Sequence, residues 1–187
     1  MGKKILVLGG QGSGKSTQAK MLAASLGLPH IAMGQLFREK SKGEGTEAGE
    51  IREALEAGNL VPDQVVTKIL NERINKNDCK NGFVLDGYPR NYAQLEGLPR
   101  DITHAFFIKV PDNIAIKRLI ERGRHDDSLD VITRRFEVFH TDTEPLLTYF
   151  RQGKILEEID GLGTIEEVHQ DIIARLQNEP NNRKRCC

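Results

Sequence analysis

Short apolar runs alternate with amphipathic segments along most of this chain of 187 residues. Runs bounded by Gly, Pro or charged residues are typical of buried strands, and apolar residues spaced three and four apart predict helices. Strands that alternate with helices predict an α/β domain in which helices cover both faces of a parallel sheet. The expected strands are residues 5–8, 30–32, 83–85, 105–110 and 155–159. The expected helices are residues 15–26, 51–57, 65–74, 114–120, 132–150 and 165–176.

The segment 132–150 carries the longest helical pattern. Ile132, Phe136, Phe139 and Leu146 recur at spacings that place them on one face of a helix. We therefore predict one long helix over this segment, with that face packed in the core.

Composition narrows the class of protein. Lys and Arg together number 27, and so do Asp and Glu, so the formal net charge is zero. A dedicated nucleic-acid binder would carry a basic surplus, so we expect no nucleic-acid partner. The sequence shows no signal peptide, and no apolar stretch approaches the roughly 20 residues of a membrane helix. The three cysteines form neither a disulfide framework nor a zinc pattern, which favours a cytoplasmic protein.

Residues 178–187 are polar and include Pro180, which predicts a flexible tail. Cys186-Cys187 beside three basic residues resembles a doubly prenylated terminus, but motifs this short carry little weight. We interpret the segment as a solvated tail and expect no membrane partner.

Residues 9–17 read Gly-Gly-Gln-Gly-Ser-Gly-Lys-Ser-Thr, which is a complete G-x-x-x-x-G-K-[ST] phosphate-binding motif. The motif lies between an apolar run and a helical segment, which is the context that it requires. Glycines let the backbone wrap around an anion, and the N–H groups at the helix start point towards it. Lys15 supplies a charge for the outer phosphates, Ser16 can offer its hydroxyl to Mg²⁺, and Thr17 lies near an inner phosphate. The motif therefore predicts a nucleotide site.

A second block, Asp86-Gly87-Tyr88-Pro89-Arg90, is followed by Gln94. Together with the phosphate-binding loop, this block resembles the nucleoside-monophosphate kinases and the adenylate kinase family in particular. Residues 30–38, 57–62 and 118–135 also match in the family's order, so the resemblance covers nearly the whole chain.

The resemblance implies a P-loop three-layer sandwich, in which a five-stranded parallel sheet has helices on both faces. It implies a single domain over residues 1–177. That domain would include a helical insertion at 33–62 that binds the monophosphate, and a short lid at 122–128.

Phosphoryl transfer between two nucleotides brings many negative oxygens together, so the protein's part is positioning and charge stabilisation. Such a site needs arginines from several directions, because the planar guanidinium binds phosphate oxygens in pairs. Arg118 and Arg122 are four residues apart on an expected helix and therefore share a face. The candidates are Arg38, Arg90, Arg118, Arg122, Arg124 and Arg135.

The resemblance implies reversible, Mg-dependent phosphoryl transfer from ATP to AMP, which gives two ADP. It places ATP against Gly10, Gln11, Gly12, Ser13, Gly14, Lys15, Ser16, Thr17 and Arg118. It places AMP against Met33, Gly34, Arg38, Val61, Gly87, Arg90, Gln94, Arg124 and Arg135. The implied catalytic residues are Lys15, Arg90, Arg122, Arg124 and Arg135. Mg²⁺ is the implied cofactor, held by Ser16 and, through water, by Asp86.

The lid segment has no cysteine, so we expect no zinc there, and the short-lid members of the family suggest a monomer. Gln11 replaces a usual proline and Ser16 a usual glycine. Met33 stands where adenylate kinases usually carry a threonine that contacts the AMP base. Methionine can pack on a base but cannot make that hydrogen bond, whereas Gln94 can pair with an adenine edge through two bonds.

AMP is therefore the first expectation for the acceptor, and UMP, CMP or a broad range of monophosphates is the alternative. A non-catalytic nucleotide sensor on the same fold is a further alternative. A GTPase is disfavoured, because the guanine-reading pattern at residues 75–78 follows a helical segment where a strand is required.

Overall fold

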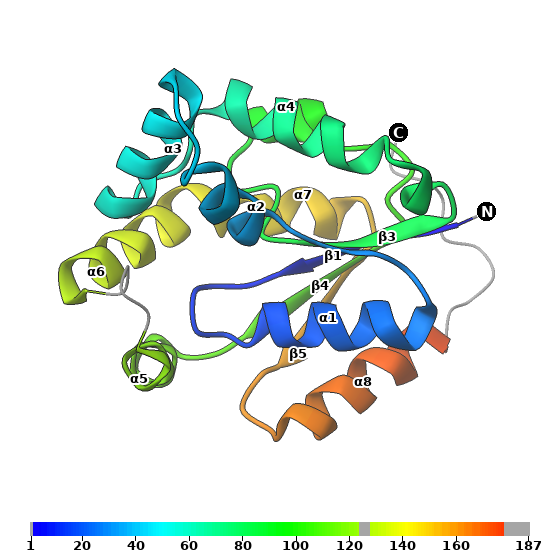
Figure 1. The fold of residues 1–187 in the computed structure, drawn as a ribbon. Helices are drawn as coiled ribbons and strands as arrows, with labels where there is room; N and C mark the ends of the chain where they lie inside the picture. Colours follow the sequence, from blue (N-terminus) through cyan, green and yellow to red (C-terminus); the bar gives the residue numbers. More distant parts are fainter. Residues whose placement is uncertain (1, 124–127, 178–187) are drawn as a thin grey trace.

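A computed structural model describes residues 2–123 and 128–177 of the chain. Five parallel strands form one sheet in the order β2-β3-β1-β4-β5. Figure 1 shows β3, β1, β4 and β5 at the centre of the molecule. The strands are β1 (Lys3–Leu8), β2 (His30–Ala32), β3 (Gly82–Asp86), β4 (His104–Lys109) and β5 (Leu156–Asp160). The predicted α/β class and the five-stranded parallel sheet are confirmed.

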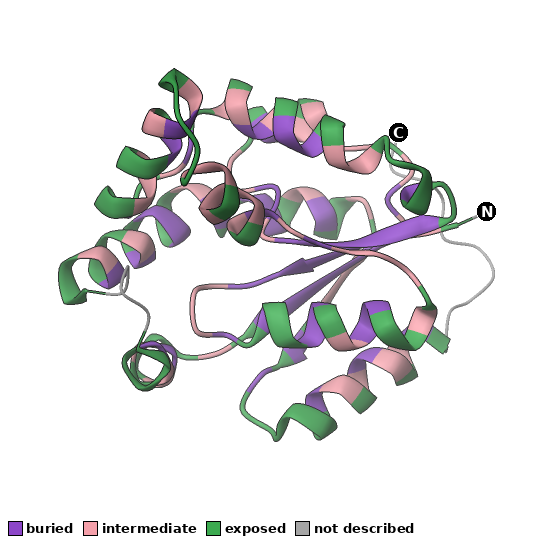
Figure 2. Cartoon of the chain, in the orientation of Figure 1, coloured by how far each residue is buried: buried purple, intermediate pink, exposed green. Residues whose placement is uncertain are grey.

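The central strands are apolar along their length because helices cover both faces of the sheet. Ile5, Leu6 and Val7 of β1 are fully buried, and Figure 2 shows the buried strands at the centre of the molecule. Successive side chains of a strand point to opposite faces. Each central strand therefore supplies both halves of the core.

One half of the core lies beneath α1 (Lys15–Leu26) and α8 (Ile165–Gln177). It contains Ile5, Val84 and Phe106 from three neighbouring strands. Figure 1 shows these two helices side by side on the same face of the sheet, which forms one outer layer of the predicted sandwich.

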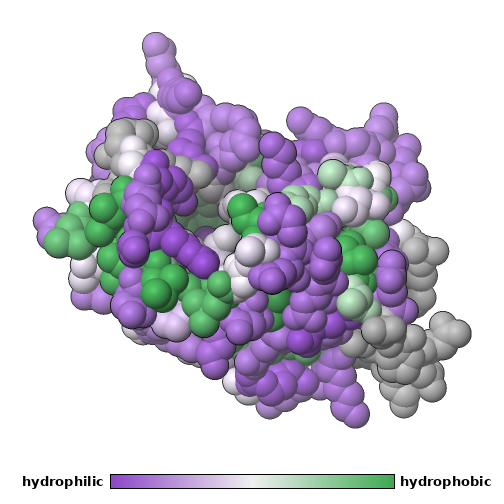
Figure 3. All heavy atoms as spheres, turned by 90° about the horizontal axis from the view of Figure 1, so that it is seen from below, coloured by the Kyte–Doolittle hydropathy of each residue, from purple (hydrophilic) through white to green (hydrophobic). Residues whose placement is uncertain are grey.

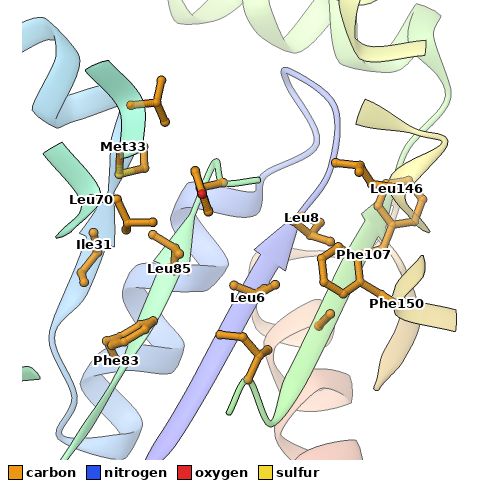
Figure 4. Close-up of a cluster of buried hydrophobic side chains, with 14 of the residues drawn as sticks. Leu6, Leu8, Ile31, Met33, Leu70, Phe83, Leu85, Phe107, Leu146 and Phe150 are labelled. Carbon is orange, nitrogen blue, oxygen red and sulfur yellow. The ribbon is translucent and has the colours of Figure 1, made fainter. Parts of the chain in front are cut away.

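The other half of the core lies against α4 (Asp63–Ile74) and α7 (Leu146–Gln152). Figure 4 shows Leu6, Phe83 and Leu85 of the strands together with Leu70 of α4 and Phe150 of α7. The two halves give the three layers that the sequence predicted.

Two helices form an insertion between β2 and α4, namely α2 (Met33–Lys40) and α3 (Thr46–Ala57). They contact each other, and α3 also contacts α6 (Leu129–Val138). The helix expected at 51–57 starts earlier, at Thr46, and no helix was expected at 33–40 from apolar spacing. Gly45, with a φ of +94°, precedes α3 and separates these two helices.

The prediction of one long helix over 132–150 is wrong. The segment contains α6, a π-helical turn at Phe139–Thr143 and then α7, which starts after Pro145. In the π turn the backbone N–H of Glu144 donates to the carbonyl of Phe139 over 2.8 Å. Pro145 lacks an N–H and cannot donate a helical hydrogen bond to the preceding turn. A new helix, α7, therefore begins after it. The predicted apolar face is nevertheless buried.

The remaining helix, α5 (Asp112–Arg122), lies between β4 and α6 in the chain. Figure 3 shows one face of the molecule, in which hydrophilic surface predominates and hydrophobic areas are interspersed. None of the helices in residues 2–123 and 128–177 is long and apolar enough to cross a membrane.

Candidate functional site

The phosphate-binding loop, residues 9–17, connects the end of β1 with the start of α1. Gly12 and Gly14 have φ of +75° and +87°, a region that side chains other than glycine rarely adopt. A Cβ at Gly12 would lie 2.3 Å from the carbonyl oxygen of Ala115 in α5. The sequence therefore places glycine where the loop turns sharply and packs directly on a neighbouring helix.

Lys15 is the first residue of α1, and its side chain turns back over the loop. The Nζ atom donates to the carbonyl oxygen of Gly10 over 2.9 Å, and the residue is only 9% exposed. This contact places the ammonium group beside the loop, where the anion would be bound. Ser16 and Thr17 are exposed at the start of the same helix.

Asp86 ends β3, and the parallel register places it beside Val7 of β1, next to the phosphate-binding loop. Burial alone would raise the pKa of the Asp86 carboxyl, but neighbouring His30 and Lys15 lower it below its ordinary value. The Nε2 atom of His30 lies 3.8 Å from Asp86 Oδ2. Asp86 is therefore a buried carboxylate, and its Oδ1 atom makes no hydrogen bond to the residues that the structure describes.

A first cavity, of about 820 Å³, lies between the phosphate-binding loop and the helical insertion. It brings together residues from the loop, from α2, from the block after β3 and from α6. The predicted site residues in its wall are Gln11, Lys15, Ser16, Thr17, Gly34, Arg38, Val61, Asp86, Gly87, Arg90, Arg122 and Arg135.

A second cavity, of about 430 Å³, lies on the other side of the loop, towards α5 and α8. The predicted site residues in its wall are Gly12, Ser13, Gly14, Lys15, Ser16, Thr17, Arg118 and Arg122. Residues that the sequence analysis did not single out, such as Gly161 and Thr164, complete this wall. Lys15, Ser16, Thr17 and Arg122 line both cavities.

The arginines reach the two cavities from different elements. Burial, with the like charge of Arg135 nearby, lowers the pKa of the Arg90 guanidinium although Asp86 opposes this. Arg135 of α6 donates from Nη2 to the carbonyl of Leu55 over 3.3 Å. Arg118 of α5 donates from Nη2 to the carbonyl of Gly161 over 3.1 Å. Cationic groups from α2, α5, α6 and the block after β3 therefore line the two cavities.

Three predicted site residues lie outside both cavity walls. Met33 is fully buried, and Figure 4 shows it near Ile31 and Leu70 in the core. Gln94 is 1% exposed, and its side chain is bonded within the protein. Gly10 lies beneath the ring of Phe139. Arg124, together with most of the proposed lid and the tail at 178–187, lies outside the described residues.

Sequence reasoning also did not single out two polar residues that are bonded to residues 90–94. Asp63 is bonded to Asn91 and Gln94, and Thr143 is bonded to the backbone of Arg90. The only sequence signal for Asp63 is its position just before the expected helix at residues 65–74. The only signal for Thr143 is that it is a polar residue within the expected helix at residues 132–150. Neither signal identifies a partner distant in the sequence.

A family model described as Adenylate kinase matches residues 7–155. An adenylate kinase of Mycobacterium tuberculosis is 41% identical over 173 residues, which are 88% of this chain and 94% of that protein. An adenylate kinase of Bifidobacterium longum is 37% identical over 186 residues, which are 93% of this chain and 100% of that protein. An adenylate kinase of Nocardia farcinica is 36% identical over 180 residues, or 92% and 98% of the two chains. The chain belongs to the adenylate kinase family.

Proposed function

We propose that this chain holds ATP in the second cavity and AMP in the first, and transfers the terminal phosphoryl group between them. As a member of its family the chain is an ATP:AMP phosphotransferase. One observation supports the assignment of the two nucleotides: the two cavities share a wall made of Lys15, Ser16, Thr17 and Arg122. Two substrates on opposite sides of a phosphate-binding loop can bring their phosphates together at that loop.

In this proposal the adenosine of ATP lies towards Arg118, and its phosphates lie on the backbone N–H groups of residues 10–15. The N-terminal end of α1 adds its positive dipole to this site. AMP lies in the larger cavity, where Arg38 and Arg90 hold its phosphate. Gly87 has a φ of +82°, a backbone conformation that favours glycine, and its carbonyl accepts a hydrogen bond from Arg90.

The chain contributes positioning and positive charge to the transfer. The phosphate of AMP is itself the nucleophile, so no side chain forms a covalent intermediate. Lys15, Arg90, Arg122 and Arg135 neutralise the charge that the transferring oxygens carry, and Arg124 is proposed to join them. Fixed cations of this kind stabilise the transition state without reorganising during the reaction.

The residues around Asp86 fit a magnesium site. Mg²⁺ prefers oxygen ligands and retains several waters, and the buried Asp86 carboxylate has an oxygen that makes no hydrogen bond to the described residues. We propose that Ser16 and, through water, Asp86 hold the ion. When bound, Mg²⁺ would neutralise charge on the phosphates of ATP.

Both cavities are built by one chain, so the proposal requires no second copy, and we propose a monomer acting as one domain over residues 1–177. The insertion at 33–62 supplies the wall residues Arg38 and Val61 of the AMP cavity.

Paired variants test the assignment of the two nucleotides. Arg118→Ala should raise the KM for ATP by about tenfold with little change for AMP, because one charged hydrogen-bonding group is lost. Arg38→Ala should show the opposite pattern. Arg100→Ala, which alters an exposed arginine outside both cavity walls, is the control. If both cavity variants change the two KM values equally, the assignment is wrong.

A further inference from the structure

Asp63, the first residue of α4, accepts two hydrogen bonds on one carboxylate oxygen. Asn91 Nδ2 donates to Asp63 Oδ1 over 2.9 Å, and Gln94 Nε2 donates to the same atom over 2.8 Å. A carboxylate only accepts hydrogen bonds. Both amide groups must therefore turn their nitrogen towards Asp63 and their oxygen away from it.

The two amide oxygens accept hydrogen bonds from the backbone of the segment that carries Arg90. Asn91 Oδ1 accepts from the N–H of Gln94 over 3.0 Å. Gln94 Oε1 accepts from the N–H of Arg90 over 2.8 Å. Asp63 therefore fixes the orientation of two side-chain amides, and these amides accept hydrogen bonds from the backbone N–H groups of Arg90 and Gln94.

Gln94 is held at its other groups as well. Its carbonyl oxygen accepts from the hydroxyl of Tyr88, and the residue is 1% exposed. Burial raises the pKa of Tyr88 to about 12, so this hydroxyl keeps its proton and stays a donor at neutral pH. With its backbone and its side chain bonded, Gln94 is a fixed support for Arg90.

We propose that Asp63 is a positioning residue for the transfer reaction. Its carboxylate fixes the amides of Asn91 and Gln94, and these hold the backbone of Arg90 so that the guanidinium faces the AMP cavity. The Nε atom of Arg90 donates to the carbonyl of Gly87 over 3.0 Å, which fixes the direction of the side chain. The inference rests on the proposed role of Arg90 in binding the acceptor phosphate.

A carboxylate in the first turn of a helix also stabilises the helix through its dipole. The test must therefore distinguish the positioning of Arg90 from a general effect of Asp63 on the stability of α4. Glu166 provides the matched control, because it lies in the first turn of α8 and is not itself part of either cavity wall. Asp63→Asn provides the conservative change, because an amide oxygen can accept both hydrogen bonds without carrying a charge.

Steady-state kinetics of Asp63→Ala, Asp63→Asn and Glu166→Ala test the proposal. For Asp63→Ala we expect kcat/KM for the monophosphate to fall by about tenfold, the equivalent of one lost hydrogen bond to a charged group. The KM for ATP should stay within about twofold, and so should all constants of the other two variants. Equal losses for both substrates, unchanged constants in Asp63→Ala, or a loss as large in Asp63→Asn would overturn the proposal.

Amide hydrogen exchange gives a readout that does not depend on activity. Exchange at the N–H groups of Arg90 and Gln94 should accelerate in Asp63→Ala and remain slow in Asp63→Asn. If the parent chain does not transfer phosphoryl groups, the proposed function fails, while the exchange result still decides whether Asp63 holds Arg90. Unchanged exchange at both groups in Asp63→Ala would contradict the inference alone.

Discussion

The hydroxyl of Thr143 donates a hydrogen bond of 2.7 Å to the backbone carbonyl of Arg90. Thr143 is buried and is the last residue of the π-helical turn Phe139–Thr143. The same turn places the ring of Phe139 over Gly10 in the phosphate-binding loop. One irregular turn therefore contacts both the loop and the segment that carries the acceptor arginine.

Thr143→Val should lower the free energy of unfolding by about 1–2 kcal/mol, because it leaves the partly buried carbonyl of Arg90 without its donor. Valine has nearly the same shape as threonine, so packing should be preserved. Urea denaturation of the parent and the variant measures the difference. Thr141→Val alters an exposed threonine of the same turn and should be close to neutral. Equal stability of the two variants would contradict the role given to Thr143.

Gly12→Ala and Gly14→Ala should differ in their effect on ATP binding. Both residues have positive φ. A Cβ at Gly12 would lie 2.3 Å from the carbonyl oxygen of Ala115, whereas a Cβ at Gly14 would have no atom of another part of the described chain within 4 Å. We expect Gly14→Ala to cost about 1–2 kcal/mol of stability from backbone strain alone. Gly12→Ala should cost more and also weaken ATP binding, because α5 and Arg118 must shift. Calorimetric titration with ATP and thermal unfolding measure both effects, and a smaller effect at Gly12 would refute this account.

Met33→Thr tests the residue that departs from the family pattern. Met33 is fully buried, so we expect the substitution to cost about 2–3 kcal/mol through lost packing and a newly buried hydroxyl. The hypothesis that methionine weakens base discrimination also predicts a sharper preference for AMP over UMP and CMP in the variant. The ratio of kcat/KM values for these acceptors measures the preference. An unchanged ratio would leave Met33 as a core residue only.

The stability provided by His140 should depend on pH. Its Nδ1 atom lies 2.7 Å from Glu144 Oε2 and its Nε2 atom 2.8 Å from Asp112 Oδ2, which raises the pKa of His140 above 6.5. The protonated form is the one that the folded state favours. Its contribution is therefore fully present below the pKa of the unfolded chain and is lost as the pH rises through the raised pKa of the folded state.

His140→Gln should consequently lower the free energy of unfolding more at about pH 6 than at about pH 9. The side chain is 44% exposed, so we expect the difference to be small. Thr141→Val, which changes an exposed neighbouring side chain that does not titrate, is the control and should show the same change at both values of pH. A larger loss for His140→Gln at the higher pH would contradict the assignment.

Much of the fold could be predicted from local pattern. The strands are apolar runs buried on both faces, and such runs are visible in the sequence at residues 5–8 and 83–85. The π turn could not be predicted in this way. Ile132, Phe136 and Phe139 keep helical spacing, and Leu146 is buried in the same core although it belongs to a different helix. Periodicity reports which residues face the core and does not report a break in the backbone.

In the site, too, local features could be predicted from the sequence and contacts between distant segments could not. The phosphate-binding loop is contiguous, so its glycines and Lys15 could be identified from spacing, and the structure places them between two cavities. Asp63 is bonded to Gln94 across 31 residues of sequence and Thr143 to Arg90 across 53, and no local pattern pairs them. Met33 and Gln94 were expected to contact AMP, and the structure places both in buried positions outside the cavity walls. Their roles in binding the base stay predictions.

The most direct test is turnover of ATP and Mg²⁺ with AMP, UMP, CMP, GMP and dAMP offered separately, with the products resolved by chromatography. Our account predicts rapid ADP formation with AMP, two ADP for each ATP consumed, and little ATP loss when no acceptor is present. Tight nucleotide binding without transfer to any acceptor, or ATP hydrolysis that is independent of the acceptor, would contradict it.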